Sequence, residues 1–113
     1  MHEMALAESV LQIIEHAARR EGLRCVRAIW LEIGQLSSVE PEAMRFCFDA
    51  VAGDSIAAGA RLEFVVNAGA AWCSACSEQV ALAELGAACP RCGGYQLRVT
   101  GGTEMRVKEL EGA

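Results

Sequence analysis

The sequence is poor in aromatic residues and contains no long apolar run. Aromatic residues make up 5% of the 113 residues although 53% are hydrophobic, and alanine supplies much of that apolar content. A core with so few large side chains benefits from a staple such as a bound metal ion. No apolar run approaches the ~18 residues that a membrane-spanning helix requires, so we expect no membrane span.

Basic residues are also scarce and are not clustered. Lys and Arg total 10 against 15 Asp and Glu, which gives a formal net charge of −5. Such a chain repels phosphate backbones, so nucleic-acid binding is disfavoured. The first residues lack the basic and apolar segments of a secretory signal, and we therefore expect a cytoplasmic protein. In that reducing compartment, paired cysteines indicate a metal site in preference to disulfides.

Four of the six cysteines form two matched pairs. Cys73 and Cys76 form one Cys-x-x-Cys pair, and Cys89 and Cys92 form a second pair after twelve intervening residues. Two such turns supply four thiolates at the corners of a tetrahedron, which is the pattern of a zinc ribbon. Four thiolates leave no open position, so the pattern predicts a structural Zn²⁺ site. Iron in a rubredoxin-like electron carrier is the alternative for these ligands, but it leaves the rest of the chain unexplained.

The chain contains several other residues of types that can be functional. Cys25 and Cys47 are single cysteines on apolar faces without a neighbouring histidine, so we interpret them as buried thiols. His16 lies in a helical segment among charged residues, and we expect it to be exposed. Trp30 and Leu36 are candidate partner contacts, although packing within the fold is the simpler interpretation. No nucleophile–base pair, phosphate-binding loop or paired carboxylates indicate an enzyme.

The opening residues offer a second, different metal site. A histidine at position 2 brings its Nδ1 near its own backbone nitrogen and the α-amine of Met1. A set of nitrogen ligands suits Ni²⁺ or Cu²⁺. On the residues alone, a disordered terminal histidine is the simpler interpretation of His2, and metal binding stays open as the alternative.

Periodicity predicts two helices and three strands outside the ribbon. Apolar residues at helical spacing predict a helix over 3–21, and alternation predicts strands over 23–33 and 61–67. A second helix begins near Pro41 and closes at Gly53, and a last strand follows Gly101-Gly102. The expected buried positions are Met4, Ala7, Leu11, Ile14 and Ala18 in the first helix; Met44, Cys47, Phe48 and Val51 in the second; and Leu62, Phe64 and Val66 in the strand over 61–67.

The order of elements predicts an α+β fold. We expect a small three-stranded sheet with two helices on one face, plus an inserted four-cysteine zinc ribbon. The corresponding domains are residues 1–69 with 99–113, and the ribbon over 70–98. Whether the chain is a monomer or a dimer stays open, because the ribbon could be exchanged between chains.

In the order and spacing of these motifs, the whole chain resembles the HypA/HybF family of hydrogenase accessory proteins. The resemblance rests on the opening Met1-His2-Glu3-Met4, on Ile33-Gly34-Gln35-Leu36-Ser37, on Pro41-Glu42-Ala43-Met44-Arg45-Phe46-Cys47-Phe48, on the two cysteine pairs, and on Gly101-Gly102-Thr103-Glu104-Met105-Arg106-Val107-Lys108.

The resemblance implies a nickel metallochaperone that uses two metals. Ni²⁺ would bind at the N-terminus through His2 and the amine of Met1, with Glu3 beside the site, while the four cysteines hold structural zinc. Members of the family pass nickel, together with a HypB-type GTPase, to the large-subunit precursor of a [NiFe] hydrogenase. Some members also supply urease through its accessory proteins.

This chain departs from some relatives at the zinc pairs. Ser77 and Gly93 follow the two pairs where those relatives carry histidines, so histidine-based switching of the zinc site is not expected here. The alternative function is a zinc-ribbon module for protein or nucleic-acid interaction that has no nickel function.

Overall fold

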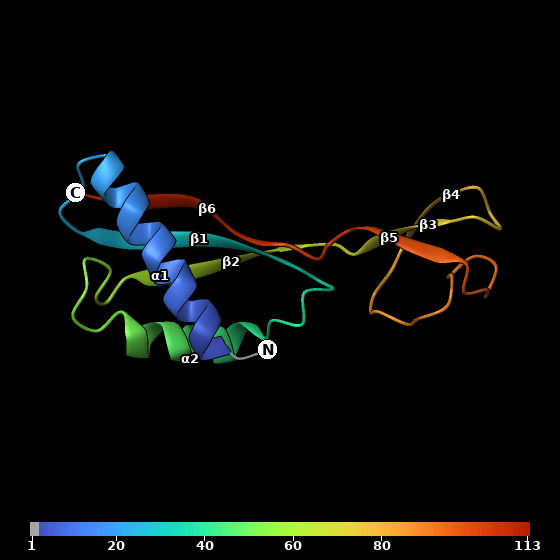
Figure 1. The fold of residues 1–113 in the computed structure, drawn as a ribbon, viewed down its shortest axis with the longest axis horizontal. Helices are drawn as coiled ribbons and strands as arrows, with labels where there is room; N and C mark the ends of the chain where they lie inside the picture. Colours follow the sequence, from blue (N-terminus) through green and yellow to red (C-terminus); the bar gives the residue numbers. More distant parts are fainter. Residues whose placement is uncertain (1–2) are drawn as a thin grey trace. The chain divides into compact units, whose positions relative to one another are not determined.

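The computed structural model describes residues 3–113, which fold into two compact units (Figure 1). Unit 1 comprises the residues up to Glu32, Val39–Val65 and Arg106–Ala113, and unit 2 comprises Ile33–Ser38 and Val66–Met105. The elements, in chain order, are α1 (Glu3–Arg20), β1 (Val26–Gly34), α2 (Pro41–Val51), β2 (Arg61–Asn67), β3 (Ala70–Cys73), β4 (Glu78–Ala81), β5 (Leu97–Gly101) and β6 (Met105–Gly112).

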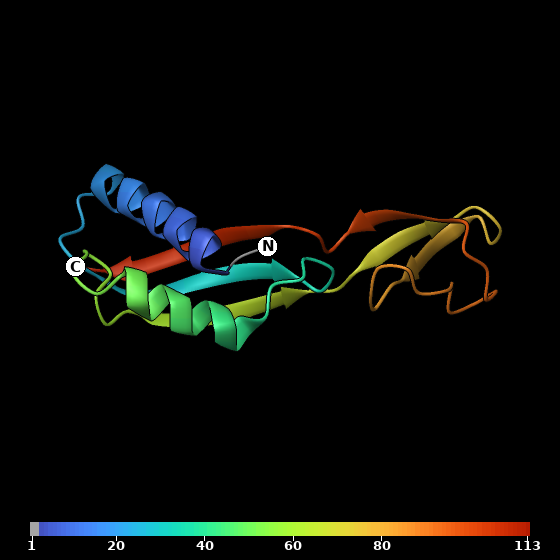
Figure 2. The same ribbon diagram turned by 60° about the horizontal axis from the view of Figure 1, so that its bottom comes forward.

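The sheet of unit 1 has the strand order β2-β1-β6. Strands β1 and β2 point the same way and are joined through α2, whereas β6 runs in the opposite direction (Figure 2). Next to the start of β1, the N–H groups of Arg24 and Cys25 donate to the carbonyl of Ala113, at 2.7 and 3.2 Å. The last strand therefore returns to the first sheet, as the sequence predicted.

Both helices cover the same face of this sheet and pack against each other (Figure 2). Helix α1 buries Ala7, Val10, Ile14 and Ala18, a stripe at steps of three and four residues. Met4 was expected in this stripe but is 41% exposed. Met4 is exposed because it lies in the first turn of α1, one turn before Ala7, the first residue that the helix buries.

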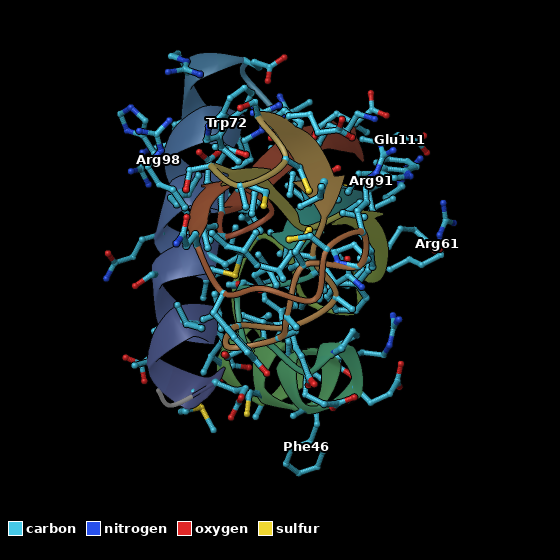
Figure 3. All side chains as sticks on the ribbon, turned by 90° about the vertical axis from the view of Figure 1, so that its right-hand side faces the viewer. Phe46, Arg61, Trp72, Arg91, Arg98 and Glu111 are labelled. Carbon is cyan, nitrogen blue, oxygen red and sulfur yellow. The ribbon has the colours of Figure 1, made fainter. Side chains whose placement is uncertain are left out.

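Helix α2 begins where its local sequence favours a helix. The carboxylate of Glu40 accepts a hydrogen bond from the N–H of Ala43 at 2.7 Å, and Pro41 occupies the first turn. Met44 and Phe48 are buried one turn apart, while Cys47, expected beside them, is only half-buried. Phe46 points outward from the helix with 74% of its area exposed (Figure 3).

The two parallel strands differ in part from their predicted patterns. Strand β1 starts at Val26, three residues later than predicted. Its buried residues change parity, since Ala28 and Ile29 are both buried, and this explains why Arg27 interrupts the expected alternation. In β2 the position predicted as buried at Val66 is 60% exposed, because the packed part of unit 1 ends at Val65.

Unit 2 holds a second sheet, with strand order β4-β3-β5 and both pairings antiparallel. In its register Ala71 lies opposite Val80 and Val99, and Cys73 lies opposite Glu78 and Leu97. Its main buried cluster is small, with six members: Leu36, Ala71, Cys73, Val80, Leu82 and Cys89. Across residues 3–113, the helices are too short or too polar to cross a membrane.

Candidate metal centre

The first cysteine pair lies in the turn that joins β3 to β4. Cys73 is the last residue of β3, and its carbonyl accepts from the N–H of Ser77 at 2.8 Å. Ser77 adopts a left-handed conformation with φ +56°, which closes the turn. The N–H of Cys76 points at the Cys73 sulfur, 3.4 Å away. The turn thus places both sulfurs on one side.

The second pair lies in a loop without helix or strand. The carbonyl of Cys89 accepts from the N–H of Gly93 at 2.9 Å, and the N–H of Cys89 donates to Gly94 at 2.8 Å. The N–H groups of Arg91 and Gly94 point at the sulfurs of Cys89 and Cys92, each at 3.4 Å. Backbone N–H groups aimed at sulfur stabilise thiolates, so both turns are built to carry negative charge.

The four sulfurs converge on one point. The Cys73 and Cys92 sulfurs are 3.8 Å apart, the Cys76 and Cys89 sulfurs are 3.9 Å apart, and all four lie within 4.8 Å of one another. A tetrahedral ion with bonds of about 2.3 Å to sulfur requires sulfurs roughly 3.8 Å apart. The donor set therefore fits a tetrahedral thiophilic ion, and within residues 3–113 it is the single cluster of metal-ligand side chains that meets this spacing.

The site has a buried side and an open side. Cys73 and Cys89 are buried in the core of unit 2, whereas Cys76 is half-buried and Cys92 is exposed. Near this site Arg91 forms an ion pair with Glu78 of β4. Both side chains are well exposed, so the pair contributes little to stability.

The thiols differ in their readiness to ionise. The N–H groups of Cys92 and Arg91 lower the pKa of Cys89 to about 7, against an opposing effect of burial. Desolvation of the sulfur, followed by the neighbouring thiols, raises the pKa of Cys76 to about 12. A bound divalent cation would remove this difference between the thiols, because it deprotonates each thiol that coordinates it.

The other candidate residues lie apart from the cluster. Cys25 and Cys47 are half-buried thiols that do not join it. His16 is exposed on α1, as expected. Trp30 is half-buried on β1, and the Arg61 guanidinium lies over its ring, 5.8 Å from the centroid. Leu36 is 5% exposed, so it is a packing residue of unit 2 and not an exposed partner contact.

The predicted nickel ligands fall mostly outside the described residues. Met1 and His2 precede the part of the chain that the structure describes. Glu3 is the first residue of α1 and is half-buried. The N–H of a residue in the first turn of a helix has no partner four residues earlier, so the backbone nitrogen of Glu3 is not committed to the helix.

Comparison with known proteins agrees with these motifs. Residues 1–112 match the family model described as "Hydrogenase/urease nickel incorporation, metallochaperone, hypA". A protein of Albidiferax ferrireducens named hydrogenase maturation factor HypA is 68% identical, and one of Rhodopseudomonas palustris strain BisB5 with the same name is 64% identical. Each alignment covers 111 residues, 98% of both chains.

A solved structure shares the fold. The solution structure of the Ni metallochaperone HypA from Helicobacter pylori superposes with a TM-score of 0.71 and 24% identity, over 99% of this chain and 97% of that one. The family match over nearly the whole length and the two highly identical relatives establish that this chain belongs to the HypA family of nickel-incorporation metallochaperones.

Proposed function

We propose that this protein binds Ni²⁺ at its N-terminus and delivers it for maturation of a [NiFe] hydrogenase. The observation that carries the proposal is the family match across residues 1–112, which includes the opening Met1-His2-Glu3. The high identity to two hydrogenase maturation factors supports the same client enzyme. The activity is metal transfer, and we propose no catalytic residue.

The two metals are separated by ligand chemistry. We propose that Zn²⁺ is held by Cys73, Cys76, Cys89 and Cys92, whose spacing fits a closed tetrahedral shell. Nickel would instead be bound by the imidazole of His2, the amine of Met1 and backbone nitrogens, a donor set that Ni²⁺ prefers. Nitrogen ligands that regain protons release their metal as pH falls, whereas a closed shell of four thiolates gives up its metal poorly.

Delivery requires partners in the maturation machinery. We propose a HypB-type GTPase and the large-subunit precursor of the hydrogenase as those partners, with urease accessory proteins as further clients. The family match, to a model described as "Hydrogenase/urease nickel incorporation", supports interaction with this machinery, and the specific partners are our proposal. The place of action is the cytoplasm, where large-subunit precursors receive their metal.

The test is calorimetric titration of Ni²⁺ into zinc-loaded protein that begins at its native Met1. We expect a single nickel ion per chain, and we expect His2→Ala to weaken binding by about a hundredfold or more because it removes the imidazole. His16→Ala is the matched control, since His16 is the other histidine of the chain and is exposed.

Two results would overturn the proposal. If His2→Ala binds nickel as tightly as the native protein, the N-terminal site is wrong. If neither protein binds nickel while zinc content is intact, the chain is a zinc-ribbon interaction module and not a nickel carrier.

A further inference from the structure

The segment that follows β1 packs inside the metal-binding unit. Residues 33–38 lie between β1 and α2 in the sequence, yet they belong to unit 2. Leu36 is 5% exposed and lies in the same buried cluster as Cys73 and Cys89, two of the four proposed zinc ligands. Of the six members of this cluster, Leu36 is one of four that carry no proposed zinc ligand, and Ala87 and Leu97 pack partly buried against it.

Backbone hydrogen bonds hold this segment from two sides. The N–H of Leu36 donates to Gly102 at 2.7 Å, and the N–H of Gln35 donates to Asn67 at 2.8 Å. The side-chain oxygen of Gln35 accepts from the N–H of Gly69 at 2.9 Å. These partners lie on the stretches of chain that enter and leave the ribbon, so the segment ties both stretches together.

Glycines allow the three stretches to touch directly. A Cβ on Gly69 would collide with the carbonyl of Leu82 and lie 2.7 Å from the Leu36 Cγ. A Cβ on Gly34 would collide with the carbonyl of Gly102, and one on Gly102 would lie 2.5 Å from the Cα of Gly69. No side chain fits between the backbones at Gly34, Gly69 and Gly102, so the three stretches are packed directly against one another at this glycine crossing. In such close packing, a displacement of one stretch is passed to the other two.

We propose that Leu36 is a positioning residue of the four-cysteine centre, and that metal binding and ordering of Gln35–Ser37 are one coupled event. Leu36 supports the wall against which Cys73 and Cys89 are fixed, and the glycine crossing holds Leu36 in place. Coupling of this kind is reciprocal: the metal orders the segment as much as the segment retains the metal. The inference rests on the proposed zinc site.

The first experiment measures zinc release to a chromophoric chelator from the full chain. We expect Leu36→Ala to release zinc at least about tenfold faster, because it leaves a cavity in the buried cluster that contains two of the ligands. Leu36→Met, which nearly conserves volume, should restore slow release. Two leucine controls should leave the rate unchanged: Leu85→Ala, 57% exposed in the same unit, and Leu62→Ala, buried in unit 1.

A spectroscopic readout separates positioning from mere loss of stability. With cobalt in place of zinc, the visible absorption bands report the geometry of the four thiolates. We expect Leu36→Ala to change the cobalt spectrum at saturating metal, and Leu85→Ala to leave it as in the native chain. Unchanged release and an unchanged spectrum in Leu36→Ala would overturn the inference.

The reciprocal arm uses hydrogen exchange of the native sequence with and without zinc. We expect amides of residues 35–37 to exchange at least about tenfold faster without the metal, and those of the buried stripe of α1 to keep their rates. Unchanged exchange at 35–37 while β3 and β4 become labile would refute the coupling. If the native chain held no zinc at all, the proposed metal site itself would fail, and this outcome is read from metal analysis before any variant is made.

Discussion

Removal of zinc should unfold unit 2 and leave unit 1 folded. The main buried cluster of unit 2 has six residues, two of them are proposed metal ligands, and none is aromatic. Unit 1 buries large side chains that include Phe48, Ile14 and Leu31. Structural zinc in small ribbon-like peptides contributes about 10–16 kcal/mol of apparent binding free energy at neutral pH, which exceeds the stability of an ordinary domain. We therefore expect the ribbon to depend on the proposed zinc ion for its fold.

The measurement is residue-resolved hydrogen exchange, combined with metal analysis, on native protein and on Cys73→Ser. We expect Cys73→Ser to lose its zinc and the exchange protection of β3, β4 and β5. Cys73 is fully buried, so its replacement removes a ligand from the buried side of the site. Cys47→Ser is the matched control: Cys47 is a half-buried thiol outside the cluster, and its variant should keep both zinc and ribbon protection.

One outcome would refute this dependence. If the metal-free chain kept full protection in β3–β5, the small apolar core would be sufficient by itself. Loss of protection in α1 and α2 together with the ribbon would show instead that the two units unfold as one, contrary to their separate cores.

Local patterns predicted the elements of unit 1 well, since each depends on neighbours in sequence. Helix α2 and strand β2 lie where periodicity and the Glu40-Pro41 start placed them. Met4 and Val66 were expected to be buried and are not, because periodicity identifies a face of an element but not where the element's partner ends. The position of Leu36 depends on contacts with residues far along the chain. The sequence favoured packing over partner contact for Leu36, but it could not show which residues Leu36 packs against.

The metal centre shows the same distinction. The spacing of the cysteine pairs predicted that four sulfurs would converge, because a Cys-x-x-Cys turn fixes its two sulfurs locally. The spacing did not indicate which ligands are buried or which apolar residues support them. A glycine in each of three distant stretches, at Gly34, Gly69 and Gly102, was the available sign of a close crossing, but its meaning required the three stretches to be placed together.

A single glycine inserted before Met1 should abolish tight nickel binding while zinc binding and the fold persist. Helix α1 begins at Glu3, and the N-terminal end of a helix carries partial positive charge, which disfavours a cation. A nickel site there depends on strong nitrogen donors, with the Glu3 carboxylate offsetting the helix charge. The insertion moves the α-amine one residue away, about 3.8 Å along the chain, and would break the chelate that we propose it forms with the His2 imidazole.

We expect the inserted glycine to weaken Ni²⁺ binding by about a hundredfold or more, comparable to His2→Ala, because either change removes one donor of the same chelate. Calorimetry on zinc-loaded protein measures the loss, and circular dichroism checks that the helices are unchanged. Glu3→Gln is the companion variant. It keeps every nitrogen donor and removes one negative charge, so it should weaken binding by less than either change.

Nickel binding that survives the insertion but not His2→Ala would assign the imidazole to the site and exclude the amine. Survival of both changes would place nickel elsewhere, and the exposed side of the thiolate cluster at Cys92 would then be the position to test next.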